Sequence, residues 1–363
     1  MSKKKHEKPF IIMWIILTLM LIFRYGQGTD YYAYFLQYEY IDSAGSFWIN
    51  ALGHGEIGWY ILLLTANKLG LSFFVFLGII SFVMMISIYR VISKYSPYKI
   101  LSLLLLFPTF YLTYCYSAIR QGLVLCLFLG FGFELLLNKK YLKYYLLTFV
   151  LVLFHTSAVI LLLLPALLNW KNNKILIALG LSIVGGFVIY YGQGILMAAS
   201  ESYRKVEFSI LAIVVRLIVF YVVRKLYKSA HISEVNTNDK VISVAYSIYE
   251  VGILLFMALC WTSTLSQRLT MPLKAVEIFL IPMLMYRNSF KLDKILNSSK
   301  YQSVVISLLL IVAITNVEFV KNIYSYINQG NYRSFVTPLN YPYVSVFNQQ
   351  EIYTYITNFD EEL

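Results

Sequence analysis

The chain has 363 residues, of which 59% are hydrophobic and only 13% are charged, and its mean hydropathy is +0.68. A soluble domain of this size carries about twice that share of charge, so the composition excludes an ordinary soluble protein and indicates a polytopic membrane protein. The formal charge of +12 does not indicate nucleic-acid binding, because the basic residues are spread over short loops beside apolar segments, where they act as topology signals.

The first apolar segment, residues 10–23, follows a basic leader. It resembles a signal peptide, but residues 24–28 (RYGQG) lack a small-x-small cleavage site. We therefore expect an uncleaved first span with its N-terminus in the cytoplasm. Residues 24–56 are poor in basic residues and rich in Gly, Tyr and acidic residues, which predicts an external loop.

The next apolar segment, residues 57–89, is interrupted by Asn67, Lys68 and Gly70. Basic residues follow it at positions 90, 94 and 99, and these predict a single net crossing that ends in the cytoplasm. The piece before Gly70 is then expected to be re-entrant or tilted.

The apolar stretch 100–137 has a polar segment, residues 114–122, at its centre. As one helix it would be about 57 Å long, nearly twice the ~30 Å of a hydrocarbon core, so we predict two membrane helices joined by a tight turn. Ser117 is the candidate N-cap of the second helix, with Arg120 and Gln121 in its first turn. Backbone N–H groups, the helix dipole and a guanidinium would then converge on a site suited to a phosphate. An arginine that only snorkels to the headgroups is the alternative.

Residues 144–168 form either one span or a hairpin. If the basic segment 170–174 is cytoplasmic, a hairpin of two short helices is favoured, with residues 154–157 at its outer tip. Each arm would be only ~18 Å long, shorter than an average bilayer, unless the site is recessed. His155 at this tip is either a hydrogen-bonded structural residue or, with its near-neutral titration, a general base.

Five further spans are predicted, at residues 175–191, 208–223, 241–261, 269–286 and 303–320, with an outward turn at 263–268. The total is about eleven crossings in a helical bundle over residues 1–320, followed by an aromatic-rich external tail over 321–363. Four charged residues fall inside these spans: Arg216, Glu250, Lys274 and Glu277. They are predicted to form ion pairs between helices, with a part in the reaction path as the alternative.

The predicted topology separates arginine from lysine. Lysine dominates the inner loops, whereas five of the nine arginines fall on the outer side: Arg24, Arg120, Arg204, Arg268 and Arg333. Asp30, Glu56 and His155 fall on that side too. Because arginine is the better bidentate phosphate clamp, this distribution indicates an outer-leaflet site for an anionic lipid headgroup, with chance as the alternative.

The sequence contains no Asp-x-Asp, no Gly-rich nucleotide loop, no Walker sequence and no H-E-x-x-H. We therefore expect no metal and no cofactor, and no nucleotide-sugar chemistry on a cytoplasmic domain. Cys115, Cys126 and Cys260 lie within or beside spans without paired spacing, so they are interpreted as core residues.

Several short motifs extend over most of the chain: Arg24-Tyr-Gly-Gln-Gly-Thr-Asp30-Tyr-Tyr with Tyr34, Glu56-Ile-Gly-Trp, Arg120-Gln121, Phe154-His155-x-Ser-Ala, Gln267-Arg268 and Tyr341-Pro342-Tyr343. In these motifs the chain resembles the EpsG family, the Wzy-type polymerases of bacterial exopolysaccharide and capsule. The most specific pieces are Arg120-Gln121 and Phe154-His155-x-Ser-Ala. One departure is Glu56-Ile-Gly-Trp, where the family usually shows Glu-Pro-Gly-Tyr, although the acid and the glycine remain.

The resemblance implies an all-α, GT-C-like glycosyltransferase with short re-entrant or broken helices. It would lie in the bacterial cytoplasmic membrane, with its site on the outer face, and join repeat units carried on undecaprenyl diphosphate. Its partners would be this lipid-linked oligosaccharide, membrane lipids and the flippase and chain-length regulator of an export system, with no nucleic acid.

The expected site has three parts. The general base would be one of His155, Asp30 and Glu56. The diphosphate would be held without a metal by Arg120, Arg268, Arg24, Gln121 and Ser117. Sugar rings would stack on Tyr34, Tyr341 and Tyr343, although an interfacial belt also explains the tail aromatics.

Two other functions compete with a polymerase. A transporter that flips lipid-linked oligosaccharides would also need an arginine-lined cavity, but it would place cationic residues deep in the bundle and often show repeat symmetry between halves. A membrane acyltransferase would use His155 as base and would leave the outer arginines without a role.

Overall fold

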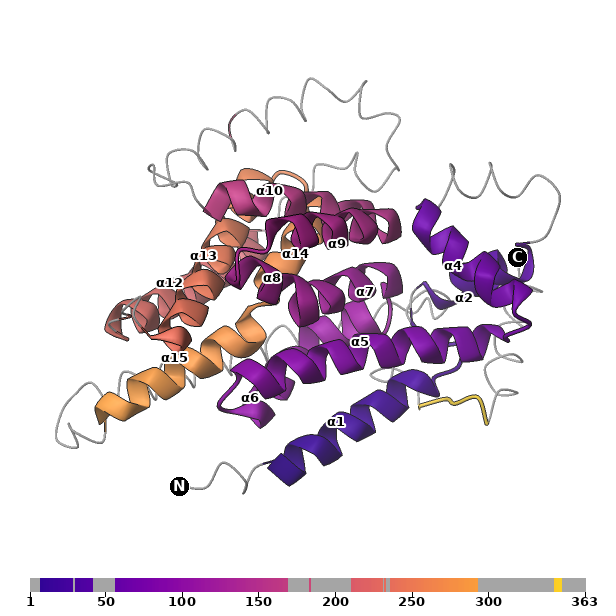
Figure 1. Ribbon diagram of the computed structural model, residues 1–363, viewed down its shortest axis with the longest axis horizontal. Helices are drawn as coiled ribbons and strands as arrows, with labels where there is room; N and C mark the ends of the chain where they lie inside the picture. The colour runs from indigo at the N-terminus through magenta and orange to yellow at the C-terminus, as the bar shows by residue number, and fades with distance from the viewer. Residues whose placement is uncertain are drawn as a thin grey trace.

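The computed structural model describes residues 7–28, 30–41, 56–168, 183, 210–230, 232, 236–292 and 343–347. This part of the chain is built of helices without strands, and Arg24 forms an antiparallel bridge with Ser345. The all-α prediction is confirmed. Residues 7–168 form one group of helices, against which the helices of 210–292 pack (Figure 1).

The predicted first span forms helix α1 (Glu7–Ile22), which packs along α5 (Phe73–Tyr95). The external loop predicted over 24–56 contains a helix that was not predicted, α2 (Tyr31–Glu39). The helix forms because its aromatic face has a partner: the Tyr31 ring lies 5.5 Å from Phe73 and the Tyr38 ring 5.7 Å from it.

The predicted interruption within 57–89 is confirmed. Helix α4 (Ile57–Lys68) ends before Gly70, whose φ of 70° lies in the left-handed region that glycine tolerates. Ser72 then caps α5 by accepting a hydrogen bond from the Val75 N–H at 3.4 Å.

The stretch 100–137 is two helical rods, as predicted. Helix α6 (Lys99–Leu106) continues into the π-helical segment η1 (Phe107–Cys115), the chain turns at 116–118, and α7 (Ile119–Leu127) continues through η2 (Phe128–Gly132) into α8 (Phe133–Leu137). The turn is tight enough that a Cβ on Gly122 would lie 2.2 Å from the Tyr114 carbonyl oxygen. Ser117 is not the N-cap: Ala118 holds that position, and the Ser117 hydroxyl donates to the Leu112 carbonyl at 3.4 Å.

The short hairpin is also present. Helix α9 (Tyr141–Phe154) and helix α10 (Val159–Leu168) are joined by His155 and the 3₁₀ turn η3 (Thr156–Ala158). The two arms pack against each other, and the Tyr144 hydroxyl of α9 donates to the Leu161 carbonyl of α10 at 2.7 Å. The arms are about 21 and 15 Å long, so His155 lies at a tip that is shallower than a full crossing.

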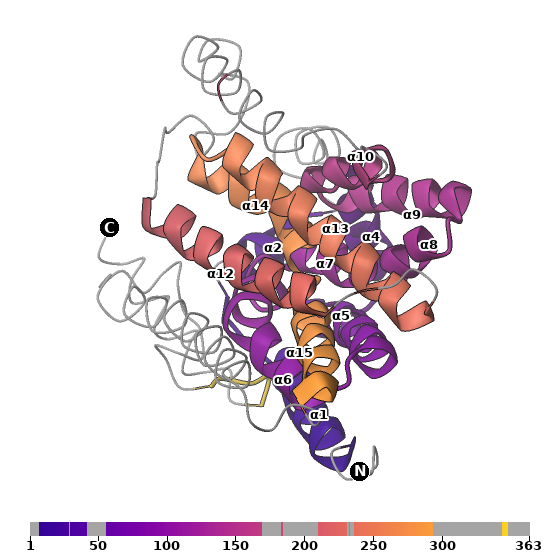
Figure 2. The same ribbon diagram turned by 90° about the vertical axis from the view of Figure 1, so that its left-hand side faces the viewer.

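The remaining described helices are α12 (Ile210–Ser229), α13 (Thr237–Ala258), α14 (Ser263–Lys274) and α15 (Glu277–Leu292), of which α12 and α13 lie in front of the other helices in Figure 2. Helices α13 and α14 pack closely where Gly252 faces Leu273. The turn predicted at 263–268 is wrong: it lies at 259–262, because α14 already begins at Ser263. Arg268 is therefore a helical residue.

Charged residues inside these helices are partnered. Lys274 Nζ lies 3.8 Å from Glu277 Oε2, across the bend between α14 and α15. Arg216 donates to the Thr270 hydroxyl at 3.0 Å and lies 3.8 Å from the centre of the Phe256 ring. The predicted ion pairing thus holds for the Lys274–Glu277 pair.

Three helices are long and apolar enough to cross a membrane, namely 73–95, 119–137 and 237–258, and a fourth candidate is the pair 265–274 and 277–288, bent by 45°. The part of the chain that is described therefore supports a membrane protein with three or four such spans. The count of about eleven remains a prediction, and the spans predicted at 175–191 and 303–320 lie outside the described residues apart from position 183.

Candidate functional site

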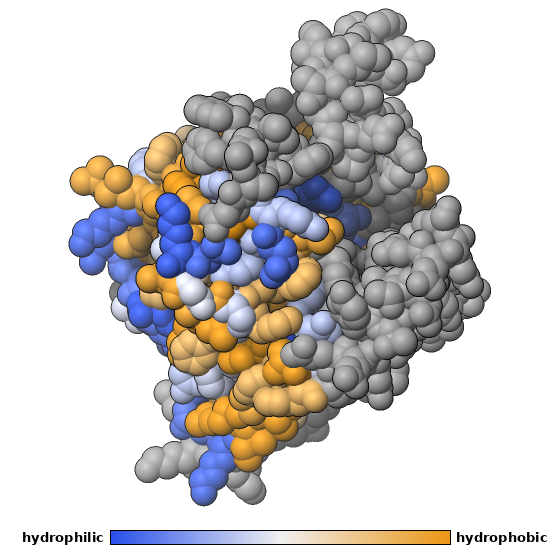
Figure 3. Space-filling view, turned by 90° about the vertical axis from the view of Figure 1, so that its right-hand side faces the viewer, coloured by the Kyte–Doolittle hydropathy of each residue, from blue (hydrophilic) through white to orange (hydrophobic). Residues whose placement is uncertain are grey.

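A cavity of about 570 Å³ lies between α2, the start of α7, the tip of the α9–α10 hairpin and α14. Figure 3 shows one face of the molecule, where hydrophilic side chains gather above a mainly apolar lower half. The volume is within the usual range of small-molecule sites, about 300–1,000 Å³. The lining residues are Asp30, Ala33, Tyr34, Leu36, Gln37, Tyr40, Ala118, Arg120, Gln121, His155 and Arg268.

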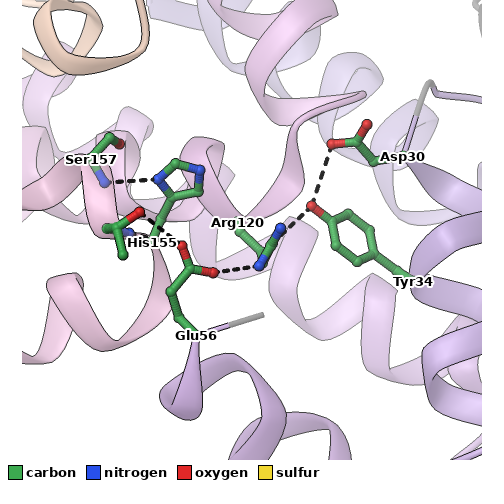
Figure 4. Close-up of polar contacts among 7 residues, drawn as sticks. Asp30, Tyr34, Glu56, Arg120, His155 and Ser157 are labelled. Carbon is green, nitrogen blue, oxygen red and sulfur yellow. Dashed lines mark hydrogen bonds and ion pairs between the residues drawn. The ribbon is translucent and has the colours of Figure 1, made fainter. Parts of the chain in front are cut away.

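Arg120 lies in the first turn of α7, as predicted, and its guanidinium is held from two sides (Figure 4). Nε donates to the Tyr34 hydroxyl at 3.1 Å, and Nη1 forms an ion pair with Glu56 Oε2. The side chain is only 19% exposed, so these contacts form in a largely desolvated place. A guanidinium has five N–H donors, and the two contacts use two of them.

Glu56 connects Arg120 to the hairpin tip. It is the N-cap of α4, and its Oε1 accepts from the Thr156 backbone N–H at 2.9 Å and from the Thr156 hydroxyl at 3.3 Å. Helix α4 reaches this position because Gly58 packs directly on α9: a Cβ there would lie 2.7 Å from the Leu153 carbonyl oxygen. Gly58, the glycine of the Glu56-Ile-Gly-Trp motif, therefore allows α4 to approach α9 closely enough to place the Glu56 carboxylate at the hairpin tip.

His155 ends α9 in an extended conformation and caps the following turn. Its Nδ1 accepts the backbone N–H of Ser157 at 3.1 Å. The residue is 9% exposed, and burial lowers its pKa to about 4, with Glu56 raising the pKa and the two cavity arginines lowering it further. The ring is therefore neutral at physiological pH.

Asp30 and Tyr34 form the opposite wall. The Tyr34 hydroxyl donates to Asp30 Oδ2 at 3.4 Å and accepts from Arg120. Burial raises the pKa of Tyr34 to about 12, against a smaller lowering by Arg120, so the phenol stays neutral. The Tyr34 hydroxyl therefore links Asp30 to Arg120 through two hydrogen bonds.

Arg268 lines the cavity from α14, and a hydrogen bond from Gln121 of α7 holds its backbone in place. The Gln121 Nε2 donates to the Arg268 carbonyl at 2.6 Å, which fixes α14 against the start of α7. Arg120 and Arg268 therefore line the same cavity although they come from different helices.

Besides Glu56, which contacts Arg120 from beside the cavity, three described site residues of the prediction lie outside its lining. Arg24 is 1% exposed, donates from Nη1 to the Cys115 carbonyl at 3.2 Å and lies 4.9 Å from the centre of the Tyr116 ring. Burial lowers its pKa. Ser117 is buried behind Ala118, and the Tyr343 hydroxyl donates to the Met20 carbonyl at 3.1 Å. Tyr341, Arg204 and Arg333 lie outside the described residues.

Sequence reasoning missed Thr156 and the α2 residues Gln37 and Tyr40. Thr156 stands inside the Phe-His-Thr-Ser-Ala motif, which was a usable signal, because a residue next to a tip histidine faces the same surroundings. Gln37 and Tyr40 can be recognised as cavity residues only from the structure, in which residues 31–39 form a helix with one face on the cavity. Among the described residues, no group of three or more His, Cys, Asp or Glu side chains is arranged to hold a metal ion.

The fold and the site together define a class of protein. It is a helical membrane bundle with two arginines, a carboxylate and a neutral histidine around one cavity. The chain belongs to the EpsG family, whose family model matches residues 8–328, nearly the whole chain. The family is one of membrane proteins of polysaccharide biosynthesis. Comparison with curated proteins and with solved structures found no match.

Proposed function

We propose that this protein is a polymerase of bacterial exopolysaccharide or capsular polysaccharide. It joins repeat units carried on undecaprenyl diphosphate, with its N-terminus in the cytoplasm and its site at the outer face of the cytoplasmic membrane. The observation that carries the proposal is that Arg120 and Arg268 line one cavity with Asp30 and His155. Family membership supports the same reaction class.

The proposed reaction needs groups that bind a diphosphate and a group that accepts a proton, and the cavity is lined by residues of both kinds. A growing chain on its lipid diphosphate donates the reducing-end sugar to a hydroxyl of the incoming lipid-linked unit. The leaving group is already a diphosphate, so the enzyme has to stabilise the charge that develops on it and to accept one proton. Arginine provides planar N–H donors that match phosphate oxygens in pairs.

In this proposal Arg120 and Arg268 bind the diphosphate, and Gln121 positions Arg268. Arg120 keeps unused N–H donors while it is held by Tyr34 and Glu56, so a phosphate can bind without breaking either contact. Tyr34 lines the cavity but is only 3% exposed, because its ring lies against Trp59 and the Arg120 guanidinium. Its stacking on a sugar stays a prediction.

The direct test uses purified protein in detergent or liposomes with a synthetic undecaprenyl-diphosphate-linked repeat unit, the products being separated by length. We expect elongation by the wild type and a rate about 10²–10³ lower for Arg120→Ala, by analogy with loss of an oxyanion-hole donor. Glu134→Gln, which removes an ion-paired carboxylate of α8 away from the cavity, is the matched control.

Two results would overturn the proposal. Elongation that continues at the wild-type rate in Arg120→Ala, with normal membrane insertion, removes the role of the arginine. Movement of the lipid-linked unit across liposomes without any lengthening identifies a flippase instead. Labelling of single cysteines placed at exposed positions near residue 40, from outside intact cells, tests the orientation: protection from a membrane-impermeant reagent contradicts an outer site.

A further inference from the structure

The turn at residues 116–118, which lies just before Arg120, is held by a segment from a distant part of the chain. Residues 24–28 follow α1 and contact this turn through a hydrogen bond to its preceding carbonyl, a hydrogen bond to its first side chain and direct backbone packing. None of these five residues lines the cavity. Their influence on the site therefore passes through the turn.

Arg24 caps the end of the first helical rod. Its Nη1 donates at 3.2 Å to the carbonyl of Cys115, the last residue of η1. The last carbonyls of a helix have no partner within the helix, so a cation that donates to one of them stabilises the helix end. The guanidinium also lies 4.9 Å from the centre of the ring of Tyr116, the first residue of the turn. Arg24 thus contacts both the end of η1 and the start of the turn.

Gln27 and Gly28 contact the same turn. The Tyr116 hydroxyl donates to Gln27 Oε1 at 2.7 Å, and Gln27 is fully buried. Gly28 has a φ of 114°, which glycine tolerates, and a Cβ there would lie 2.5 Å from the Tyr116 carbonyl oxygen. Because the backbone of the segment packs directly on the backbone of the turn, the turn has little room to shift.

A segment of the tail, residues 343–347, pairs with the segment that holds the turn and lies beside the end of α1 (Figure 1). Two backbone hydrogen bonds of 3.0 Å flank the Arg24–Ser345 bridge: the Tyr25 N–H donates to the Val344 carbonyl, and the Val346 N–H donates to the Phe23 carbonyl. Val344 is fully buried, so the tail is packed into the fold at this point. The tail therefore holds Arg24 from the side opposite in sequence to the turn.

We propose that Arg24 is a positioning residue for Arg120, and that residues 343–347 are a strap that keeps Arg24 in place. Arg24 is 1% exposed and cannot itself reach a substrate in the cavity. The strap holds the segment 24–28, this segment holds the turn 116–118, and the turn sets the direction in which α7 starts. The start of α7 then decides where the Arg120 guanidinium meets its two partners. Only the consequence for catalysis rests on the proposed function.

The native thiol of Cys115 reports whether the turn is held, because Cys115 is fully buried and its carbonyl is the one that Arg24 binds. The other two cysteines are replaced by alanine, and the rate of labelling by a small maleimide is measured in mild detergent. Val344→Asp puts a charge at a buried position of the strap, and we expect it to raise the labelling rate about tenfold or more. Phe347→Asp puts the same charge at a position that is 80% exposed, and as the matched control it should label at the wild-type rate.

Two results of the labelling would overturn the strap. One is an unchanged labelling rate of Cys115 in Val344→Asp. The other is an equal rise at Cys260, measured in a protein that keeps only that cysteine in the turn between α13 and α14, because this shows a general loosening of the fold. Faster labelling of Cys115 with an unchanged rate at Cys260 supports the strap.

The ion pair of Arg120 with Glu56 tests the role of Arg24 without any substrate. A double-mutant cycle of Glu56→Gln and Arg120→Met is measured by unfolding, first with Arg24 present and then in Arg24→Met. If Arg24 positions Arg120, the coupling between the pair should fall by about half or more in Arg24→Met. Arg24→Lys keeps a donor for the Cys115 carbonyl and should restore most of the coupling. A lower unfolding midpoint with unchanged coupling shows a residue that only stabilises the fold, and overturns the assignment.

The elongation assay tests the consequence for the reaction. A displacement of about 1 Å in a positioned group lowers a rate by about 10²-fold, which is the loss we expect for Arg24→Met. In the Arg120→Ala background the same change should cost little more, because Arg24 acts through Arg120; losses that multiply would contradict the proposal. If the wild type never elongates a lipid-linked unit, the proposed function fails, whereas the labelling and coupling results still decide the roles of Arg24 and the strap.

Discussion

Glu56 and Arg120 provide the sharpest test of how the cavity is assembled, because their ion pair joins α4 to α7. The perturbation is a double-mutant cycle with Glu56→Gln and Arg120→Met, which keep the approximate volumes and remove one charge each. The cycle isolates the energy of the pair provided that neither single change creates a new contact.

The magnitude follows from burial. The two side chains are 19% and 15% exposed. An exposed pair contributes about 0.2–1 kcal/mol, whereas breaking a fully buried pair costs about 3–5 kcal/mol. Hydrogen bonds to charged groups contribute about 1.5–3 kcal/mol. We therefore expect a coupling energy of about 2 kcal/mol. Thr156 adds to the cost of Glu56→Gln, because its backbone N–H and its hydroxyl both lose a charged acceptor.

The assay is reversible unfolding in mixed micelles by titration with SDS, followed by loss of helical circular dichroism, for the wild type, both single variants and the double variant. It needs no substrate, so it is independent of the proposed reaction. A coupling energy below about 0.5 kcal/mol, the limit within which distant sites add, would refute the reasoning that this pair holds α4 against α7.

Three more outcomes follow from the structure. Gly58→Ala places a methyl 2.7 Å from the Leu153 carbonyl oxygen and should lower the unfolding free energy by about 1–3 kcal/mol; an unchanged SDS midpoint would contradict the close packing of α4 on α9. Glu134→Gln removes two ion pairs with cation side chains 46–47% exposed and should cost at most about 1 kcal/mol for each pair, a larger loss showing that the pairs are not solvated. Since burial lowers the His155 pKa to about 4 from 6.5, the unfolded state binds the proton more tightly. Stability should then fall as the pH drops from about 6.5 to 4, by on the order of 3 kcal/mol from this group. His155→Gln should abolish that part of the pH dependence, and a profile unchanged by the substitution would contradict it.

The positions of the helix breaks were predictable from the sequence, because they follow from lengths and solvation. Residues 100–137 are too long for one crossing, and the polar residues at their centre favour a turn there; the turn at 116–118 is where the structure places it. The same reasoning placed the interruption near Gly70 and the hairpin tip at His155. Each of these depends on residues close together in the chain.

The caps and the short external helix were not predictable in the same way. Ser117 has the right side chain for an N-cap, but η1 runs on to Cys115, which turns the Ser117 hydroxyl to the Leu112 carbonyl and leaves the capping position to Ala118. Helix α2 has only nine residues, and its formation depends on aromatic partners contributed by α5.

What the sequence determined by itself is that this chain is a helical membrane protein with polar groups at certain helix ends, because hydrophobicity, charge and length act locally. Only the tertiary structure decided which of those groups share a cavity. Packing between helices far apart in the chain brings together four cavity residues: Asp30, Arg120, His155 and Arg268. Arg24 is also an arginine predicted on the outer side, but it is buried against Tyr116.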